Sequence, residues 1–237
     1  GVAAVSTTAA LLASGLAARE KKTLVITTDP GPYDAVSICS ELVQENSLDD
    51  LLILASSGGL RTADDFTAYP VNISEYLSCL RGSGDLTRIS ISAADGLARI
   101  LDMARGIYDF IIVDLYGKRG VIVDRVLSEA DLVVMCVSQN RKHIEKIIGD
   151  GVLTAVLQEK PTMMVITKFQ VYPFFDMKQE EKLLKTKGCY RLSEDDDIYR
   201  AVGEQDVANY VFGHIDGETK GLLVKKRLER TNAMEEL

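Results

Sequence analysis

Three short segments place hydroxyl or carboxylate side chains beside predicted elements, where such groups can bind a ligand. Gly1–Thr8 (GVAAVSTT) opens a predicted helix. Leu24–Pro30 (LVITTDP) contains an apolar run followed by an aspartate, and Tyr108–Asp114 (YDFIIVD) is a second apolar run that ends in an aspartate. Backbone N–H groups at a helix start can bind phosphate, and carboxylates can bind Mg²⁺. Together these segments are the strongest functional signal in the sequence.

Each segment also has a purely structural explanation. A Thr-Thr pair at a helix start is commonly an N-cap, because its hydroxyl accepts a hydrogen bond from an otherwise unpaired N–H. Asp29 before Pro30 fits a turn, and Asp114 could cap the segment after its strand. For Asp114 we favour a metal-binding role, because packing explains poorly why a carboxylate should end a fully apolar strand.

The composition excludes several classes of protein. The chain has 237 residues, of which 46% are hydrophobic and 26% charged, as in folded globular proteins. With 27 basic and 35 acidic residues the net charge is −8, so there is no strong nucleic-acid signal. Four scattered cysteines and two histidines indicate neither a zinc cage nor a disulfide framework, and we expect reduced thiols and a cytoplasmic protein.

Short β-branched runs alternate with helical patterns along almost the whole chain. This rhythm is typical of βαβ units and predicts an α/β fold with a mostly parallel, twisted sheet. The only long break is a loop expected over Ser56–Phe66. Strands are predicted at Thr23–Thr28, Arg88–Ser92, Phe110–Leu115, Leu132–Ser138, Thr162–Thr167 and Gly188–Leu192, and helices at Thr8–Arg19, 33–44, 94–105, 119–129, 140–149, 174–186, 196–202 and 218–230.

The order and spacing of the three segments resemble the ParA/MinD family of deviant Walker ATPases. In that family a K-G-G-V-G-K-[ST]-T loop precedes a helix, D-x-D-P ends the next strand, and a later apolar strand closes in D-x-P-P-G. Ser128–Ser138, Met163–Phe169 and Tyr190–Val207 resemble further family segments in the correct order. The resemblance covers essentially the whole chain and implies a single domain over residues 1–237 with a three-layer α/β/α P-loop fold.

The resemblance also implies a site for ATP or ADP with Mg²⁺. In such a site backbone N–H groups hold phosphates, and a threonine hydroxyl and a carboxylate hold the metal, the carboxylate through water. The residues concerned are Ala3, Ala4, Val5, Ser6, Thr7 and Thr8 at the phosphates, Thr7 and Asp114 at Mg²⁺, Asp29 near the attacking water, and Thr167 at the base.

The sequence departs from the family pattern at several of these positions. Ser6 stands at the loop lysine, Val5 at the glycine before it, and Gly1 at the second, signature lysine. Thr27 replaces the first aspartate of D-x-D-P, and Thr167 replaces the asparagine that binds adenine. Each lost charge-assisted contact is typically worth about 1.5 to 3 kcal/mol. We therefore expect weak binding and slow or absent hydrolysis.

Two functions follow from the resemblance. The first is a nucleotide-regulated dimer that works with a protein partner in positioning or assembling a cellular machine, such as a pilus, secretion, division or partition apparatus. The pilus-assembly (TadZ/CpaE-like) branch also carries atypical loops. The second is a pseudo-ATPase scaffold that keeps the fold and a protein-binding face without binding nucleotide. Val5, Ser6, Thr27 and Thr167 favour the scaffold, and the retained hydroxyl and carboxylates favour the ATPase.

The two ends of the sequence give two further expectations. In the family the loop follows a central strand, so we expect the natural protein to have a strand before Gly1. Thr219–Leu237 is amphipathic and resembles the membrane-targeting tail of MinD. A final helix that docks its apolar face on the domain is the favoured alternative, because the apolar face is short and contains no Phe or Trp.

Overall fold

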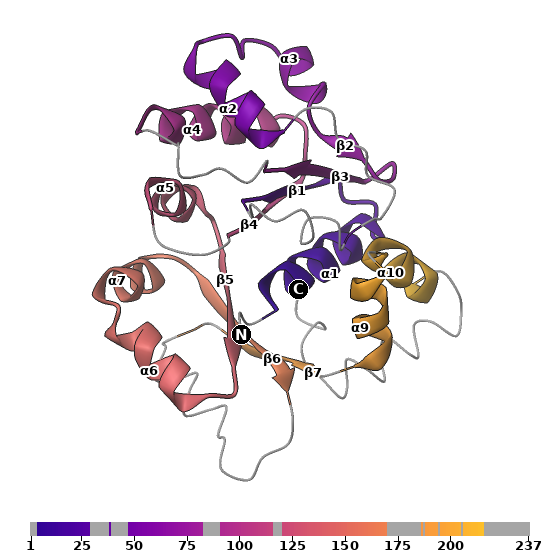
Figure 1. Ribbon diagram of the computed structural model, residues 1–237, viewed down its shortest axis with the longest axis vertical. Helices are drawn as coiled ribbons and strands as arrows, with labels where there is room; N and C mark the ends of the chain where they lie inside the picture. Colours follow the sequence, from indigo (N-terminus) through magenta and orange to yellow (C-terminus); the bar gives the residue numbers. More distant parts are fainter. Residues whose placement is uncertain are drawn as a thin grey trace. The chain divides into compact units, whose positions relative to one another are not determined.

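The computed structural model describes residues 4–28, 38, 47–82, 91–115, 120–169, 186, 188–193, 195–204 and 206–215 (Figure 1). Ala3, Asp29 and residues 216–237 lie outside the described residues, as do nearly all of the predicted helices at 33–44 and 174–186. The chain forms two compact units. The four-stranded unit comprises Val5–Val126 and Arg200–Gly213, and the three-stranded unit comprises Gly1–Ala4, Leu127–Tyr199 and His214–Leu237.

The sheet of the four-stranded unit is mostly parallel. Its strand order is β2-β3-β1-β4, with β1 parallel to both β3 and β4, and β2 antiparallel to β3. All five residues of β1 are buried, as expected for a strand covered on both faces. The strands are β1 (Thr23–Thr27), β2 (Val71–Asn72), β3 (Leu77–Arg81) and β4 (Phe110–Asp114).

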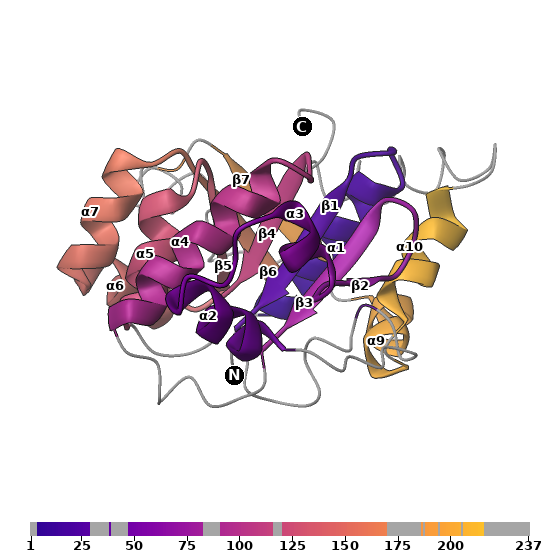
Figure 2. The same cartoon turned by 90° about the horizontal axis from the view of Figure 1, so that it is seen from above.

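Helices cover both faces of this sheet. Leu24 and Ile26 of β1 share a hydrophobic core with residues of α2, α3 and α4, so these helices cover one face, the side from which Figure 2 is viewed. Helix α1 packs against β1, β3 and β4 on the other face (Figure 1). The helices that this unit contains or begins are α1 (Val5–Ala17), α2 (Leu48–Ser56), α3 (Ala63–Thr67), α4 (Ile91–Arg105), α5 (Val121–Glu129) and α10 (Val207–Ile215).

The three-stranded unit has a parallel sheet of order β5-β6-β7. Met135 and Val137 of β5 and Met164 of β6 form a core with Ile144 and Leu157, which come from the helices α6 and α7. These helices therefore cover one face of the sheet. The elements are β5 (Val133–Ser138), α6 (Arg141–Gly149), α7 (Gly151–Glu159), β6 (Thr162–Phe169), β7 (Cys189–Ser193) and α9 (Asp196–Gly203), which contains a boundary between the units.

The predicted α/β fold with parallel strands is confirmed, but two of the predicted segments are wrong. The strand expected at Arg88–Ser92 is contradicted because Ile91 and Ser92 begin α4, and the strand in this part of the chain is β3. The loop expected over Ser56–Phe66 is interrupted by α3. Thr62 and Asp65 form a capping box, in which each side chain pairs with the other residue's backbone N–H, and this starts the helix.

Gly96 marks a close approach between α2 and α4. A Cβ atom added there would lie 2.8 Å from Ser56 Oγ and 3.2 Å from the Leu52 carbonyl oxygen. We expect Gly96→Val to lower the free energy of unfolding by about 1–3 kcal/mol in urea titrations, because the backbone carbonyl cannot move aside without separating the helices. Gly213 in α10 has open space around it, so Gly213→Val is the matched control. Equal effects of the two substitutions would contradict this packing argument.

Among the residues that the structure describes, no helix is both long enough and apolar enough to cross a membrane.

Candidate functional site

The first turn of α1 lies at the carboxyl end of β1. The short segment Ala18–Lys22 joins the end of α1 to the start of β1, so helix and strand run in opposite directions while they pack together. Thr7 is half-buried and Thr8 is buried in this first turn. Ligands of parallel α/β sheets bind at the carboxyl ends of the strands. Both predicted threonines are therefore at the end of the sheet where a ligand would bind.

The backbone immediately before α1 is strained. Ala4 has a φ of 30°, in the left-handed region that costs a residue with a Cβ atom about 1–2 kcal/mol. Such strained residues cluster at ligand-binding loops, where the surrounding structure holds them in place. Val5 and Ser6 follow as the first helical residues and are half-buried. Neither carries a charge, so the described part of this loop offers only backbone N–H groups and the Ser6 hydroxyl as donors.

Asp114 ends β4 in a buried position. The residue is 4% exposed, and its Oδ1 atom is shielded from solvent. Its backbone carbonyl accepts hydrogen bonds from the Thr28 N–H and from Thr28 Oγ1, both at 3.0 Å. Thr28 thus holds the ends of β1 and β4 together. An ionised carboxylate in such a place requires a nearby cation or strong donors to offset its lost hydration.

Arg81, Thr27 and Asp114 form one row across three strands. Thr27 pairs in register with Arg81 of β3 on one side and with Asp114 of β4 on the other. Leu24 and Ile26 point to the face covered by α2 and α4, so the alternation of a strand directs Thr27 and its two partners to the α1 face. The row lies at the carboxyl end of the sheet, as does the start of α1.

Cys79 lies on the same face, two residues before Arg81. Burial raises the pKa of its thiol to about 12, while the positive charge of Arg81 lowers it and the negative charge of Asp114 raises it further. Both charges therefore act on the apolar layer between the sheet and α1. The thiol stays protonated, so we assign it a packing role.

The raised pKa of Cys79 predicts a pH dependence of stability. Between about pH 9 and pH 12 the thiol is ionised in the unfolded chain but protonated in the folded one, so unfolding releases a proton. We expect the free energy of unfolding to fall by up to about 1.4 kcal/mol per pH unit in this range, relative to Cys79→Ala. Urea titrations at several pH values measure the two slopes. Identical slopes would show that the thiol ionises equally in both states.

The groups at this end of the unit suit Mg²⁺ better than a softer metal. Thr7, Thr8 and Asp114 offer hydroxyl and carboxylate oxygens, which are hard ligands. Among the described residues no group of three or more His, Cys, Asp and Glu side chains could hold a metal ion. Mg²⁺ commonly takes one or two protein oxygens and fills its other positions with water and phosphate, so this donor set fits it.

Thr167 lies in the other unit, at the carboxyl end of β6. Its side chain is buried, and Oγ1 donates a hydrogen bond to the Val137 carbonyl at 3.3 Å. Lys168 follows with a φ of 53° at a bulge in the pairing with β7. The Thr167 hydroxyl therefore joins β5 and β6. It is a poor replacement for the asparagine amide that, in the family pattern, hydrogen-bonds to the base.

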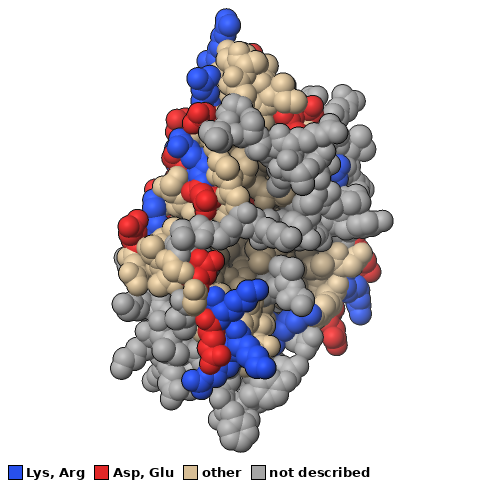
Figure 3. Space-filling view, turned by 60° about the vertical axis from the view of Figure 1, so that its left-hand side comes forward, with Lys and Arg blue, Asp and Glu red and all other residues tan. Residues whose placement is uncertain are grey.

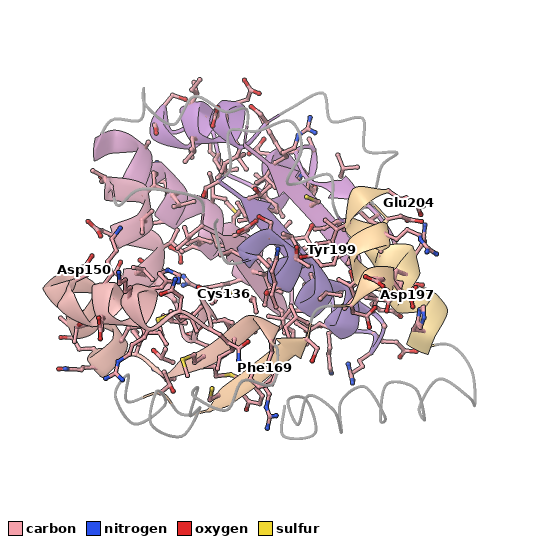
Figure 4. The ribbon with its side chains drawn as sticks, turned by 60° about the horizontal axis from the view of Figure 1, so that its bottom comes forward. Cys136, Asp150, Phe169, Asp197, Tyr199 and Glu204 are labelled. Carbon is pink, nitrogen blue, oxygen red and sulfur yellow. The ribbon has the colours of Figure 1, made fainter. Side chains whose placement is uncertain are left out.

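Cationic and aromatic side chains surround this strand end. Lys168 Nζ lies 5.2 Å from the centre of the Tyr199 ring, and Arg191 Cζ lies 4.9 Å from that of Phe169. Figure 4 labels the two aromatic residues. Sequence reasoning missed these pairs, because only the β6–β7 register and the start of α9 bring their members together.

On the face shown in Figure 3, Lys and Arg side chains lie among Asp and Glu side chains.

Comparison with known proteins shows which fold this is. No protein-family model and no curated protein sequence matches the chain. A ParA family ATPase from Chlorobium tepidum TLS matches with a TM-score of 0.69 and 15% identity, over 96% of this chain and 93% of that one. The septum site-determining protein MinD with Mg-ADP from Pyrococcus horikoshii OT3 matches with 0.67 and 16%, over 94% and 88%.

A third structure, the MinC:MinD cell division protein complex of Aquifex aeolicus, matches with a TM-score of 0.63 and 19% identity, over 95% of this chain and 91% of that one. All three likenesses extend over nearly the full length of both chains. The chain therefore has the fold of the ParA/MinD ATPases, as the sequence resemblance implied.

Proposed function

We propose that this protein is a nucleotide-regulated switch that binds ATP or ADP with Mg²⁺ at the carboxyl end of the four-stranded unit. The observation that carries the proposal is the buried carboxylate of Asp114 at the end of β4, at the same end of the sheet as the first turn of α1. Packing alone gives no reason to place a carboxylate there, whereas a metal ion does.

The proposed roles follow from this placement. Thr7 and Asp114 hold Mg²⁺, the aspartate through water, and backbone N–H groups of residues 3–8 hold the phosphates. Mg²⁺ would supply charge neutralisation between the phosphate oxygens. Asp29 is proposed to orient the attacking water. Because Ser6 and Val5 replace the family's lysine and glycine, turnover is slow, and binding rather than hydrolysis changes the state of the protein.

A dimer acting on a protein partner is the form of switch that we propose. The structural neighbours include a MinD with Mg-ADP and a MinC:MinD complex, which supports nucleotide and partner binding on this fold. The process would be the positioning or assembly of a cellular machine. Sedimentation velocity of the full chain without nucleotide, with Mg-ADP and with Mg-ATP tests the switch, and we expect a shift toward the dimer with Mg-ATP alone.

The second candidate is a scaffold that does not bind nucleotide. Two observations favour it: the uncharged start of α1, and the use of the Thr167 hydroxyl within the sheet. Identical sedimentation in all three conditions, together with no detectable nucleotide binding, would establish the scaffold and reject the switch.

A further inference from the structure

We propose that Arg81 supplies the positive charge that holds phosphate at the nucleotide site, in place of the lysine that the loop lacks. This inference rests on the proposed function and adds a residue that the family resemblance did not assign. It begins from a deficit of charge. A di- or triphosphate needs compensation by cations beyond one Mg²⁺, and Val5, Ser6, Thr7 and Thr8 provide none.

The described ends of the three parallel strands contain one cation. β1 ends in Thr27 and Thr28, β4 ends in Asp114 and Leu115, and β3 ends in Arg81 and Gly82. Within these residues the only positive charge is that of Arg81. Its side chain is half-buried, so it is neither free in solvent nor enclosed in the core.

The register directs Arg81 toward the face where the ligand would lie. Its pairing with Thr27 places it in the row that ends in Asp114, and that row points to the α1 face. Neighbouring strands are about 4.8 Å apart, so two strand spacings, about 10 Å, separate the backbones of Arg81 and Asp114. Because Thr27 itself is buried, the ligand would lie beyond the ends of the strands, with the carboxylate toward Mg²⁺ and the guanidinium toward phosphate.

The electrostatic environment of Cys79 agrees with this geometry. The thiol lies on the same face, and its pKa, which burial raises, is lowered by the charge of Arg81 and raised further by that of Asp114. A guanidinium is well suited to the role, because its planar fork donates two parallel hydrogen bonds to a phosphate. Lysine at this position would keep the charge but lose the paired donors.

A purely structural role for Arg81 makes a different prediction. If Arg81 only balances the buried charge of Asp114, its loss lowers stability and affects all nucleotides equally. If it holds the β- or γ-phosphate, its loss weakens ATP binding more than AMP binding. The ratio of the two affinities therefore separates the roles, and it does not depend on how much stability the substitution costs.

The experiment is calorimetric titration of the full chain with ATP, ADP and AMP in the presence of Mg²⁺. The variants are Arg81→Ala, Arg81→Lys and the control Arg105→Ala, which removes an exposed arginine that pairs with Asp102 on α4. We expect Arg81→Ala to weaken ATP binding by about 10- to 100-fold, with a much smaller change for AMP. Arg81→Lys should recover part of the loss, and Arg105→Ala should bind like the wild type.

The outcomes distinguish this inference from the proposed function. Wild-type ATP binding that Arg81→Ala leaves unchanged, or weakens equally for ATP and AMP, would overturn the role of Arg81 and leave the switch in place. No ATP binding by the wild type would overturn both. Should Arg81→Ala fail to fold, as judged by its melting curve, Arg81→Lys and Arg81→Gln decide the matter. The proposal then requires Arg81→Gln to bind ATP more weakly than Arg81→Lys does.

Discussion

Asp114→Asn is expected to weaken Mg²⁺-dependent nucleotide binding by about 10- to 100-fold, the cost typical of groups that support a bound metal through its outer shell. The substitution keeps the size of the side chain and removes its charge, so the buried end of β4 stays filled. Titration with ATP in Mg²⁺ and in EDTA measures the effect. In EDTA the variant should bind as weakly as the wild type, because the lost contribution is that of the metal.

Asp109→Asn is the matched control for that prediction. Asp109 lies just before β4, and its Oδ2 atom accepts a hydrogen bond from the Lys22 N–H at 2.9 Å. It therefore sits at the opposite end of the strand from Asp114. Normal binding by Asp109→Asn is expected. Equal weakening by the two substitutions would show that the loss reflects the charge or stability of the protein and that Asp114 has no metal-binding role.

Phe66→Ala is expected to lower the free energy of unfolding by about 3–5 kcal/mol. Phe66 is 0% exposed in the core between the sheet and its covering helices. Its ring meets that of Tyr108 edge to face, with centroids 6.4 Å apart. Alanine would leave a cavity that α3 cannot fill without separating from α4. Urea denaturation followed by circular dichroism measures the change.

Phe110→Ala provides the comparison for this core prediction. Phe110 begins β4 and is 43% exposed, so its loss removes little packing and should cost well under half as much. Because both substitutions delete the same side chain, the difference between them reports burial. Similar losses at the two positions would contradict the assignment of Phe66 to the centre of this core.

Strands with long apolar runs were predictable from the sequence, and shorter or mixed ones were not. LVIT in β1 and FIIV in β4 stand out because they are unbroken apolar runs, which is the pattern of strands in a mostly parallel sheet. β3 was missed because its sequence, LSCLR, interrupts the apolar run with Ser78 and ends in a charge. Helix α3 was missed because ADDF shows no apolar period, and its start depends on the capping box at Thr62.

The candidate site could be predicted only in part, because some of its residues are brought together by strand pairing and not by their spacing in the sequence. Asp114 could be proposed from the sequence because a carboxylate at the end of an apolar strand is visible in one segment. Arg81 could not be proposed from the sequence, because its place in the row with Thr27 and Asp114 depends on a pairing between β1 and β3, whose residues lie far apart in the chain. The use of the Thr167 hydroxyl by Val137 is likewise a consequence of strand register. Contacts between strands belong to the tertiary structure and cannot be predicted from local sequence periodicity.

Nucleotide binding is the central claim, and titration calorimetry of the full-length protein with ATP and ADP, each with and without Mg²⁺, tests it most directly. We predict micromolar binding that requires Mg²⁺, with the site formed at the start of α1 and the end of β4. Absence of heat at millimolar ATP in the presence of Mg²⁺ would contradict the claim. The protein would then be a scaffold on the fold of the ParA/MinD ATPases.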